Sequence, residues 1–152
     1  MNSKASEEQL AGFIAKYTPE IGALARAALT KMRARLPGAI ELVYDNYNAL
    51  AIGFSPTERA SDAIFSIALY PRWVSLFFFP GVDLPDPEKL LKGSGKVTRH
   101  IVLKGATDLD KPAIKALMKH ALERSAKPLD KTSPGRIVIK SISAKQRPRR
   151  PT

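Results

Sequence analysis

The 152-residue sequence contains no cysteine, and this absence excludes disulfide bonds, thiolate metal sites and cysteine nucleophiles. Only two histidines occur, His100 and His120, and neither has a histidine or cysteine at the spacing of zinc ligands. The longest apolar run covers only residues 76–80, so no membrane span is expected. Residues 1–9 are polar and lack the apolar core of a signal peptide. Together these absences predict a cytoplasmic protein without a metal site.

Recognisable catalytic motifs are also missing. Residues 92–96, Lys-Gly-Ser-Gly-Lys, look like a phosphate-binding loop, but Leu90 stands where a P-loop has its first glycine. Val97 then follows the lysine, where a P-loop has serine or threonine. The dinucleotide-binding pattern fails because residue 98 is threonine, and no Gly-x-Ser-x-Gly turn is present to hold a serine nucleophile. We therefore predict a protein that is not an enzyme, with no catalytic residue and no cofactor.

What the chain does contain is enough apolar sequence for one folded domain and a large excess of positive charge. Hydrophobic residues make up 44% of the sequence, too many for a disordered chain. The net charge is +11, of which residues 126–152 carry +7 and residues 1–125 only +4. The last residues are basic and too poor in apolar side chains to order themselves, so we predict a disordered tail over residues 144–152.

The cations of this tail suit nonspecific contact with a polyanion such as nucleic acid. Each lysine or arginine that meets a phosphate releases counterions, so such binding weakens steeply with salt. No aromatic residue lies between the charges, so the contact would carry no sequence preference. The residues predicted to bind nucleic acid are Lys145, Arg147, Arg149 and Arg150. The alternative is a tail that only solubilises the chain and has no partner.

The hydrophobic pattern predicts both helices and strands. Helices are expected over residues 6–17, 19–36, 86–91 and 110–126. Ser6 with Gln9 is expected to form a capping box, and Thr18-Pro19 is a second helix start. Strands are expected over residues 41–44, 49–54, 63–70, 73–79, 98–104 and 137–142. We therefore predict a two-layer α+β fold, in which helices pack on one face of a mostly antiparallel sheet of five to six strands.

One predicted surface combines aromatic, amide and cationic side chains. The junction of the first two strands contains tyrosine and asparagine, which can stack on a ligand and hydrogen-bond to it. The glycine loop at 92–96 offers backbone amides and cations to an anion. The residues predicted to bind a small anionic ligand, or a protein partner, are Tyr44, Asn46, Tyr47, Trp73, Lys96 and Arg99. The alternative is structural: a hydrogen-bonded turn, core packing of the tryptophan, and a helix stop followed by a strand start.

Three further segments are informative when they are taken together. They are Leu-Val-Tyr-Asp-Asn-Tyr-Asn-Ala-Leu-Ala-Ile-Gly-Phe at 42–54, Leu-Phe-Phe-Phe-Pro-Gly at 76–81 and Leu-Leu-Lys-Gly-Ser-Gly-Lys at 90–96. In these segments the chain resembles the YdhG-like family. The resemblance covers residues 10–125 and implies an α+β domain over residues 1–126. An extension with one further strand would then occupy residues 127–143. The resemblance implies no activity for most members, although some are described as frataxin-like intracellular iron chaperones.

An iron chaperone needs clustered oxygen ligands, and this sequence offers them poorly. The densest acidic group is Asp83, Asp86 and Glu88. Asp86 and Glu88 are already accounted for as the cap and the first-turn acid of an expected helix. The positive charge of the body also opposes cation uptake. Iron delivery is therefore the third hypothesis, after ligand binding and nucleic-acid binding, and no metal ligand is assigned.

Overall fold

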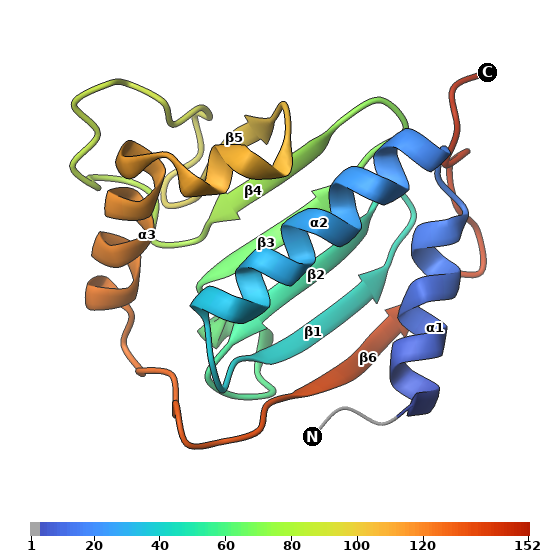
Figure 1. Ribbon diagram of the computed structural model, residues 1–152, viewed down its shortest axis with the longest axis horizontal. Helices are drawn as coiled ribbons and strands as arrows, with labels where there is room; N and C mark the ends of the chain where they lie inside the picture. Colours follow the sequence, from blue (N-terminus) through green and yellow to red (C-terminus); the bar gives the residue numbers. More distant parts are fainter. Residues whose placement is uncertain (1–3) are drawn as a thin grey trace.

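The computed structural model describes residues 4–152, and residues 1–3 lie outside the described part. Helices and strands follow one another as α1 (Lys4–Ala15), α2 (Pro19–Arg35), β1 (Ile40–Asp45), β2 (Leu50–Ser55), η1 (Ala60–Asp62), β3 (Phe65–Leu69), β4 (Val74–Phe78), β5 (Arg99–Leu103), η2 (Ala106–Asp110), α3 (Pro112–Arg124) and β6 (Arg136–Ile142). The strands form one sheet, and the helices lie against one face of it (Figure 1). The predicted two-layer α+β fold is confirmed.

Five strands cross the sheet in sequence, and the sixth returns to the far edge. The order across the sheet is β5-β4-β3-β2-β1-β6. Neighbours from β1 to β5 are antiparallel, whereas β6 runs parallel to β1. The chain reaches β6 through α3 and the segment 125–135, which passes around the lower side of the view (Figure 1). The further strand predicted near the C-terminus is therefore confirmed, and it makes β1 an interior strand.

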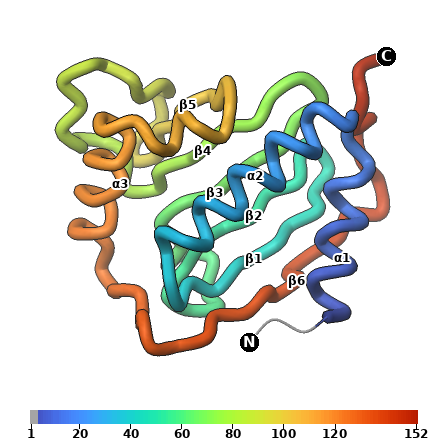
Figure 2. Tube along the Cα trace, viewed as in Figure 1, coloured from blue at the N-terminus to red at the C-terminus, as the bar shows by residue number. Residues whose placement is uncertain are grey.

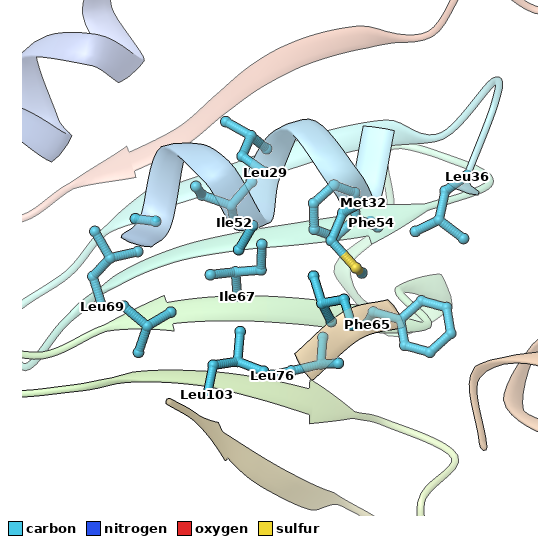
Figure 3. Close-up of a cluster of buried hydrophobic side chains, with 14 of the residues drawn as sticks. Leu29, Met32, Leu36, Ile52, Phe54, Phe65, Ile67, Leu69, Leu76 and Leu103 are labelled. Carbon is cyan, nitrogen blue, oxygen red and sulfur yellow. The ribbon is translucent and has the colours of Figure 1, made fainter. Parts of the chain in front are cut away.

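Helix α2 lies across the middle of the sheet and supplies much of the core. Leu29 and Met32 come from this helix and lie over Ile52 of β2 and Ile67 of β3 (Figure 3). Fully burying an aliphatic side chain of this size stabilises a fold by about 1.5–3 kcal/mol. Leu76 of β4 belongs to the same core, so the strand expected over residues 73–79 buries one face under the helices. Apolar contact therefore joins the two layers, and an ion pair adds to it, because the guanidinium of Arg33 in α2 lies 2.7 Å from the carboxylate of the buried Glu41 in β1.

The ends of α2 follow from local sequence. The hydroxyl oxygen of Thr18 accepts a hydrogen bond from the backbone N–H of Ile21 at 3.3 Å, and Pro19 occupies the first helical position. After the helix, Gly38 takes a positive φ of 85°. A Cβ atom there would lie 1.8 Å from the carbonyl oxygen of Asp130, so only glycine fits. These features direct the chain from α2 into β1.

Two helices begin at other residues than the sequence predicts. Helix α1 already includes Lys4, so Ser6 lies inside the helix and does not cap it. Helix α3 begins at Pro112, because the preceding residues 106–110 form the separate 3-10 turn η2 that ends at Asp110. Proline is well suited to a first helical position, which explains why it and not the aspartate opens α3. Both helices are otherwise confirmed.

The helix predicted over residues 86–91 is wrong. Both carboxylate oxygens of Asp86 accept backbone N–H bonds, from Leu90 and from Leu91, each at 2.9 Å. Lys89 has a positive φ of 54°, which cannot continue a right-handed helix. Asp86, the residue expected to begin a helix, therefore stabilises a turn. The acid expected to cap a helix instead holds a loop against the edge of the sheet.

Candidate anion-binding site

The structure divides the six residues predicted to bind a ligand between the two ends of the sheet. Four lie at the end where β1 finishes and β4 begins, and they are Tyr44, Asn46, Tyr47 and Trp73. Lys96 and Arg99 lie at the opposite end, because Arg99 opens β5 and pairs with Phe78, the last residue of β4. The single surface expected from the sequence is therefore not formed.

The opposite end, around the glycine loop, offers an anion little. The guanidinium of Arg99 donates hydrogen bonds to the carbonyl oxygens of Gly95 and of Thr98, the second at 2.9 Å. Lys96 is exposed and forms no ion pair within residues 4–152. Arg99 therefore braces its own loop, and the exposed cations that remain in the loop are Lys92 and Lys96.

Tyr44 and Asn46 take structural positions. Val43 faces the helices, so its neighbour Tyr44 lies on the other face of the sheet. Its hydroxyl is buried without a hydrogen-bond partner in the described chain, and burial raises its pKa. The side-chain oxygen of Asn46 accepts a hydrogen bond from the Ser141 hydroxyl at 2.9 Å. The hydroxyl of Tyr44 is therefore closed to a ligand from solvent, and the side-chain oxygen of Asn46 is already occupied.

The C-terminal segment, residues 143–152, differs most from its prediction. It has no helix or strand, but it is fixed to the fold by backbone hydrogen bonds. Ser143 donates to the carbonyl oxygen of Asp45 at 2.9 Å, and Arg147 donates to that of Tyr47 at 2.8 Å. In Figure 2 the red end of the trace runs beside the junction of α1 and α2. The segment predicted to be a disordered tail is therefore held along one end of the sheet.

A buried ion pair anchors this segment. Arg149 is only 6% exposed, and its guanidinium donates to the carboxylate of the fully buried Asp45 at 2.9 Å. Lys16 donates to the other oxygen of that carboxylate at 2.7 Å. Burial acts to raise the pKa of Asp45, but hydrogen bonds from Lys16, Gln146 and Arg149 together with the charge of Lys16 outweigh it and lower the pKa. Arg149 was predicted to contact nucleic acid, and its burial removes it from that role.

Tyr17 completes the anchor by tying two strands to the helices. Its hydroxyl donates to the carbonyl oxygen of Leu69 at 2.9 Å and accepts from the backbone N–H of Leu50 at 3.1 Å. The guanidinium of Arg149 lies 5.8 Å from the centroid of its ring. Burial is the main cause that raises the pKa of this phenol. The ends of β2 and β3 and the C-terminal segment are thus held in one arrangement.

Next to the anchor lies a surface cavity of about 550 Å³, here called the C-terminal depression. Its walls come from the β1–β2 turn, the β3–β4 turn and the C-terminal segment. The lining residues are Asn48, Tyr70, Pro71, Arg72, Trp73, Arg147, Pro148, Arg150, Pro151 and Thr152. Three are arginines, and no aspartate or glutamate side chain is among them. The depression is therefore a cationic site with an aromatic wall.

The aromatic wall is ordered by ring stacking. Tyr70 and Trp73 are stacked with their ring centroids 4.8 Å apart and their planes at 21°. Trp73 is 42% exposed, so the core packing considered for it does not occur. Arg72 lies between these two residues in the turn and forms no ion pair within residues 4–152. The turn presents indole and guanidinium together.

Arg147 and Arg150 enter the depression from the C-terminal segment. The guanidinium carbon of Arg147 lies 5.7 Å from the centroid of the Tyr47 ring, a cation–π arrangement. Arg150 donates to the carbonyl oxygens of Lys16 at 3.2 Å and Ala15 at 3.4 Å, at the C-terminal end of α1. Lys145, the remaining predicted contact for nucleic acid, is exposed and does not line the depression.

The acidic residues give no support for an iron site. No group of three or more histidine, aspartate or glutamate side chains within residues 4–152 is arranged to hold a metal ion. The carboxylate of Asp86 is already used by two backbone amides. The iron hypothesis therefore gains nothing from the positions of Asp83, Asp86 and Glu88.

Comparisons with known proteins do not identify this chain. No family model, no curated protein and no solved structure matches it. The resemblance to the YdhG-like family consequently stays a prediction. Within the part of the chain that the structure describes, no helix has the length and apolar character needed to cross a lipid bilayer.

Sequence analysis missed most of the residues that line the depression. In the sequence, Tyr70 ends one expected strand, Arg72 lies between two expected strands, and Asn48 lies at the junction of the first two strands. The arginines of the C-terminal segment were found by charge but assigned to a disordered tail. A usable signal was the presence of an arginine between two aromatic residues in Tyr70-Pro71-Arg72-Trp73.

Proposed function

We propose that this protein binds a small anionic ligand in the C-terminal depression. One observation carries the proposal: three arginines line the cavity and no aspartate or glutamate side chain does. Arginine presents a planar fork of N–H donors that fits phosphate and carboxylate groups. Ligands with these groups are therefore the chemical class that the site favours. Of the six residues that the sequence indicated, Trp73 lines this cavity, and the Tyr47 ring lies against Arg147, which also lines it.

The charges of the site are available to a ligand. Arg72 and Arg147 form no ion pair in residues 4–152, so binding an anion would not first break one. Asp45, which could compete for them, is fully buried and already paired with Lys16 and Arg149. The buried anchor thus supports the binding surface without neutralising it. Backbone hydrogen bonds fix the C-terminal segment in place, so little ordering would accompany binding.

The chain offers its own reporter for a binding test, because Trp73 is its only tryptophan. Inorganic pyrophosphate should change the emission of Trp73 in a saturable titration. Arg72→Gln and Arg147→Gln should each weaken binding by about tenfold or more, since each removes a charge-assisted hydrogen bond. Arg59→Gln is the matched control, because Arg59 is exposed, forms no ion pair in residues 4–152, and lies in the loop after β2 at the other end of the sheet. The control should bind like the wild type.

Either of two results would count against the proposal. One is an emission that does not respond to millimolar pyrophosphate, dicarboxylate or nucleotide. The other is an equal loss of affinity in Arg72→Gln and Arg59→Gln, which would show attraction by net charge alone. A protein partner was the second possibility from the sequence, and an acidic peptide that displaces pyrophosphate in the same titration would support it.

Several expectations from the sequence remain predictions beside this proposal. They are membership in the YdhG-like family, the absence of catalytic activity and a place in the cytoplasm, which the lack of cysteine favours. Iron delivery is not favoured by any side-chain cluster in the described chain. Nucleic-acid binding, in contrast, is favoured by the exposed aromatic rings of Tyr47 and Trp73 at this end of the sheet.

A further inference from the structure

The exposed aromatic rings of the molecule gather at the end of the sheet that carries the C-terminal depression. Tyr47 is 44% exposed and Trp73 is 42% exposed. No other phenylalanine, tyrosine or tryptophan in residues 4–152 is as exposed as these two. Tyr47 lies in the β1–β2 turn and Trp73 in the β3–β4 turn. Both turns meet the same end because β1 to β4 run alternately up and down the sheet.

Each exposed ring has an arginine beside it. Arg147 lies 5.7 Å from the centroid of Tyr47, and Arg72 directly precedes Trp73 in its turn. The indole is also held in one orientation by its stack on Tyr70. Two ring and guanidinium pairs therefore lie at this end of the sheet. Arg72, Trp73 and Arg147 line the cavity, and the Tyr47 ring lies next to it against Arg147. An isolated inorganic anion would use the guanidinium groups and leave the exposed rings without a role.

We infer that the anionic ligand of the C-terminal depression is single-stranded nucleic acid. Its bases would stack on Trp73 and Tyr47, and its phosphates would meet Arg72 and Arg147. Exposed rings beside a cationic groove are the combination by which proteins hold unpaired nucleotides. Bases in a duplex are already stacked on one another, so their faces are closed to these rings. The inference rests on the proposed anion-binding function and names the ligand class of that site.

This structure also changes what the basic C-terminal segment can do. In the sequence no aromatic residue lies between its charges, which indicated a contact through phosphates alone. Folding brings the Tyr47 ring to Arg147 from 100 residues earlier in the chain. Folding also buries Arg149, so the cations available to phosphate are fewer than the sequence indicates. The C-terminal segment would therefore contact a few bases of a nucleic acid through the neighbouring ring, rather than many phosphates through its charges alone.

The test compares two labelled strands by fluorescence anisotropy at low salt. One is an oligothymidylate of about eight nucleotides, and the other is an abasic strand of equal length and charge. The oligothymidylate should bind about tenfold tighter or more, because only it has bases to stack. Trp73→Ala should weaken oligothymidylate binding about 5- to 100-fold and leave the abasic strand unchanged. Tyr47→Ala is the second variant and should act in the same direction.

Salt dependence separates the arginines from the rings. Arg72→Gln should weaken both strands and make the slope of log affinity against log salt shallower by about 0.7. Trp73→Ala should leave that slope unchanged, because it removes no charge. Arg59→Gln is again the control and should alter neither affinity nor slope. Circular dichroism confirms that each variant is folded before it is compared.

The outcomes distinguish this inference from the proposed function. Equal affinity for the two strands, or an unchanged oligothymidylate affinity in both ring variants, would overturn the inference while pyrophosphate binding still supported the function. Failure of both pyrophosphate and the oligothymidylate to bind would overturn both. Equal weakening by Arg59→Gln and Arg72→Gln would show attraction by net charge alone and would also overturn the inference.

Discussion

The two ends of the sheet carry similar chemistry in sequence and very different chemistry in space. One end has the glycine loop with Lys96 and Arg99, and the other has the C-terminal depression. At the first end Arg99 bonds to carbonyls of its own loop. At the second end three arginines and an aromatic stack come from segments far apart in the chain. Figure 2 shows residues 82–98 on the left and the C-terminus on the right.

This difference teaches that cations form a site when the fold leaves them without internal partners. At the depression the acid that would neutralise the arginines, Asp45, is buried and occupied by Lys16 and Arg149. Within the C-terminal segment, Arg149 is buried with that acid and Arg150 donates to carbonyls at the end of α1, whereas Arg147 forms no ion pair within residues 4–152. At the glycine loop the one arginine, Arg99, instead donates hydrogen bonds to backbone carbonyls of the same loop. The predictions below test this contrast.

The largest expected effect follows from removing the buried charge. Asp45→Asn leaves Arg149 buried without an anion, which should lower the free energy of unfolding by about 3–5 kcal/mol. It should also weaken pyrophosphate binding, because the C-terminal segment loses its anchor. Denaturant unfolding at neutral pH measures the first effect. Asp110→Asn is the matched control, since that carboxylate forms its ion pairs at 45% exposure and should matter much less. Equal losses of unfolding free energy in the two variants would contradict the claim that Asp45 anchors the C-terminal segment.

Acid should act through the same carboxylate. Burial opposes the ionisation of Asp45, but hydrogen bonds from Lys16, Gln146 and Arg149 outweigh it, so folding lowers the pKa of this carboxyl. A lowered folded pKa stabilises the protein above the ordinary carboxyl pKa of about 3.9, and this contribution is lost as the pH falls through the folded pKa. Unfolding measured from neutral pH to below about pH 4 should therefore show the gap between wild type and Asp45→Asn closing. A gap that stays constant would mean that the carboxylate is not the stabilising group.

A smaller effect is expected from the hydroxyl that joins β2 to β3. Tyr17→Phe removes a donor to Leu69 and an acceptor for Leu50, so one buried carbonyl and one buried N–H lose their partner. The cost should be about 1–3 kcal/mol in the free energy of unfolding. Tyr44→Phe is a matched control, because the Tyr44 hydroxyl is buried but has no partner within residues 4–152. That control should be neutral or stabilising, and a loss equal to that of Tyr17→Phe would contradict the assignment.

The smallest effect is expected at the glycine loop. Lys96→Gln should change the free energy of unfolding by less than about 0.5 kcal/mol, because the side chain is an exposed surface group without a partner in the described chain. Pyrophosphate affinity should also stay within about twofold of the wild type, a difference of less than half a kcal/mol. Tryptophan emission and denaturant unfolding measure the two quantities. A large loss of affinity would move the anion site to the end that the sequence first indicated.

The fold was largely predictable because its signals are local and periodic. Alternation placed Leu76 and Phe78 in the core, and the Thr18-Pro19 pair marked the start of α2. The helix expected at 86–91 failed because its start signal is equally suited to a turn. There the carboxylate of Asp86 binds amides four and five residues later instead of capping a helix. Local chemistry alone does not separate these two outcomes.

The site was predictable only in part because it depends on register and long-range pairing. Trp73 and Arg99 are close in sequence, yet the antiparallel pairing of β4 with β5 sends them to opposite ends of the sheet. The burial of Arg149 depends on Asp45, 104 residues earlier, and no pattern within the tail reveals that contact. Charge located the arginines, and only the fold showed which of them remain free.

The most direct test of this contrast is a nitrogen–proton correlation spectrum of the whole chain, titrated with pyrophosphate. Both ends of the sheet report in one spectrum, so no variant is needed. We predict that the indole signal of Trp73 and the amide signals of Arg72 and Arg147 shift in a saturable way. Amide signals from residues 93–99 should stay in place. Saturable shifts confined to residues 93–99, with an unmoved indole signal, would contradict the placement of the anion site in the C-terminal depression.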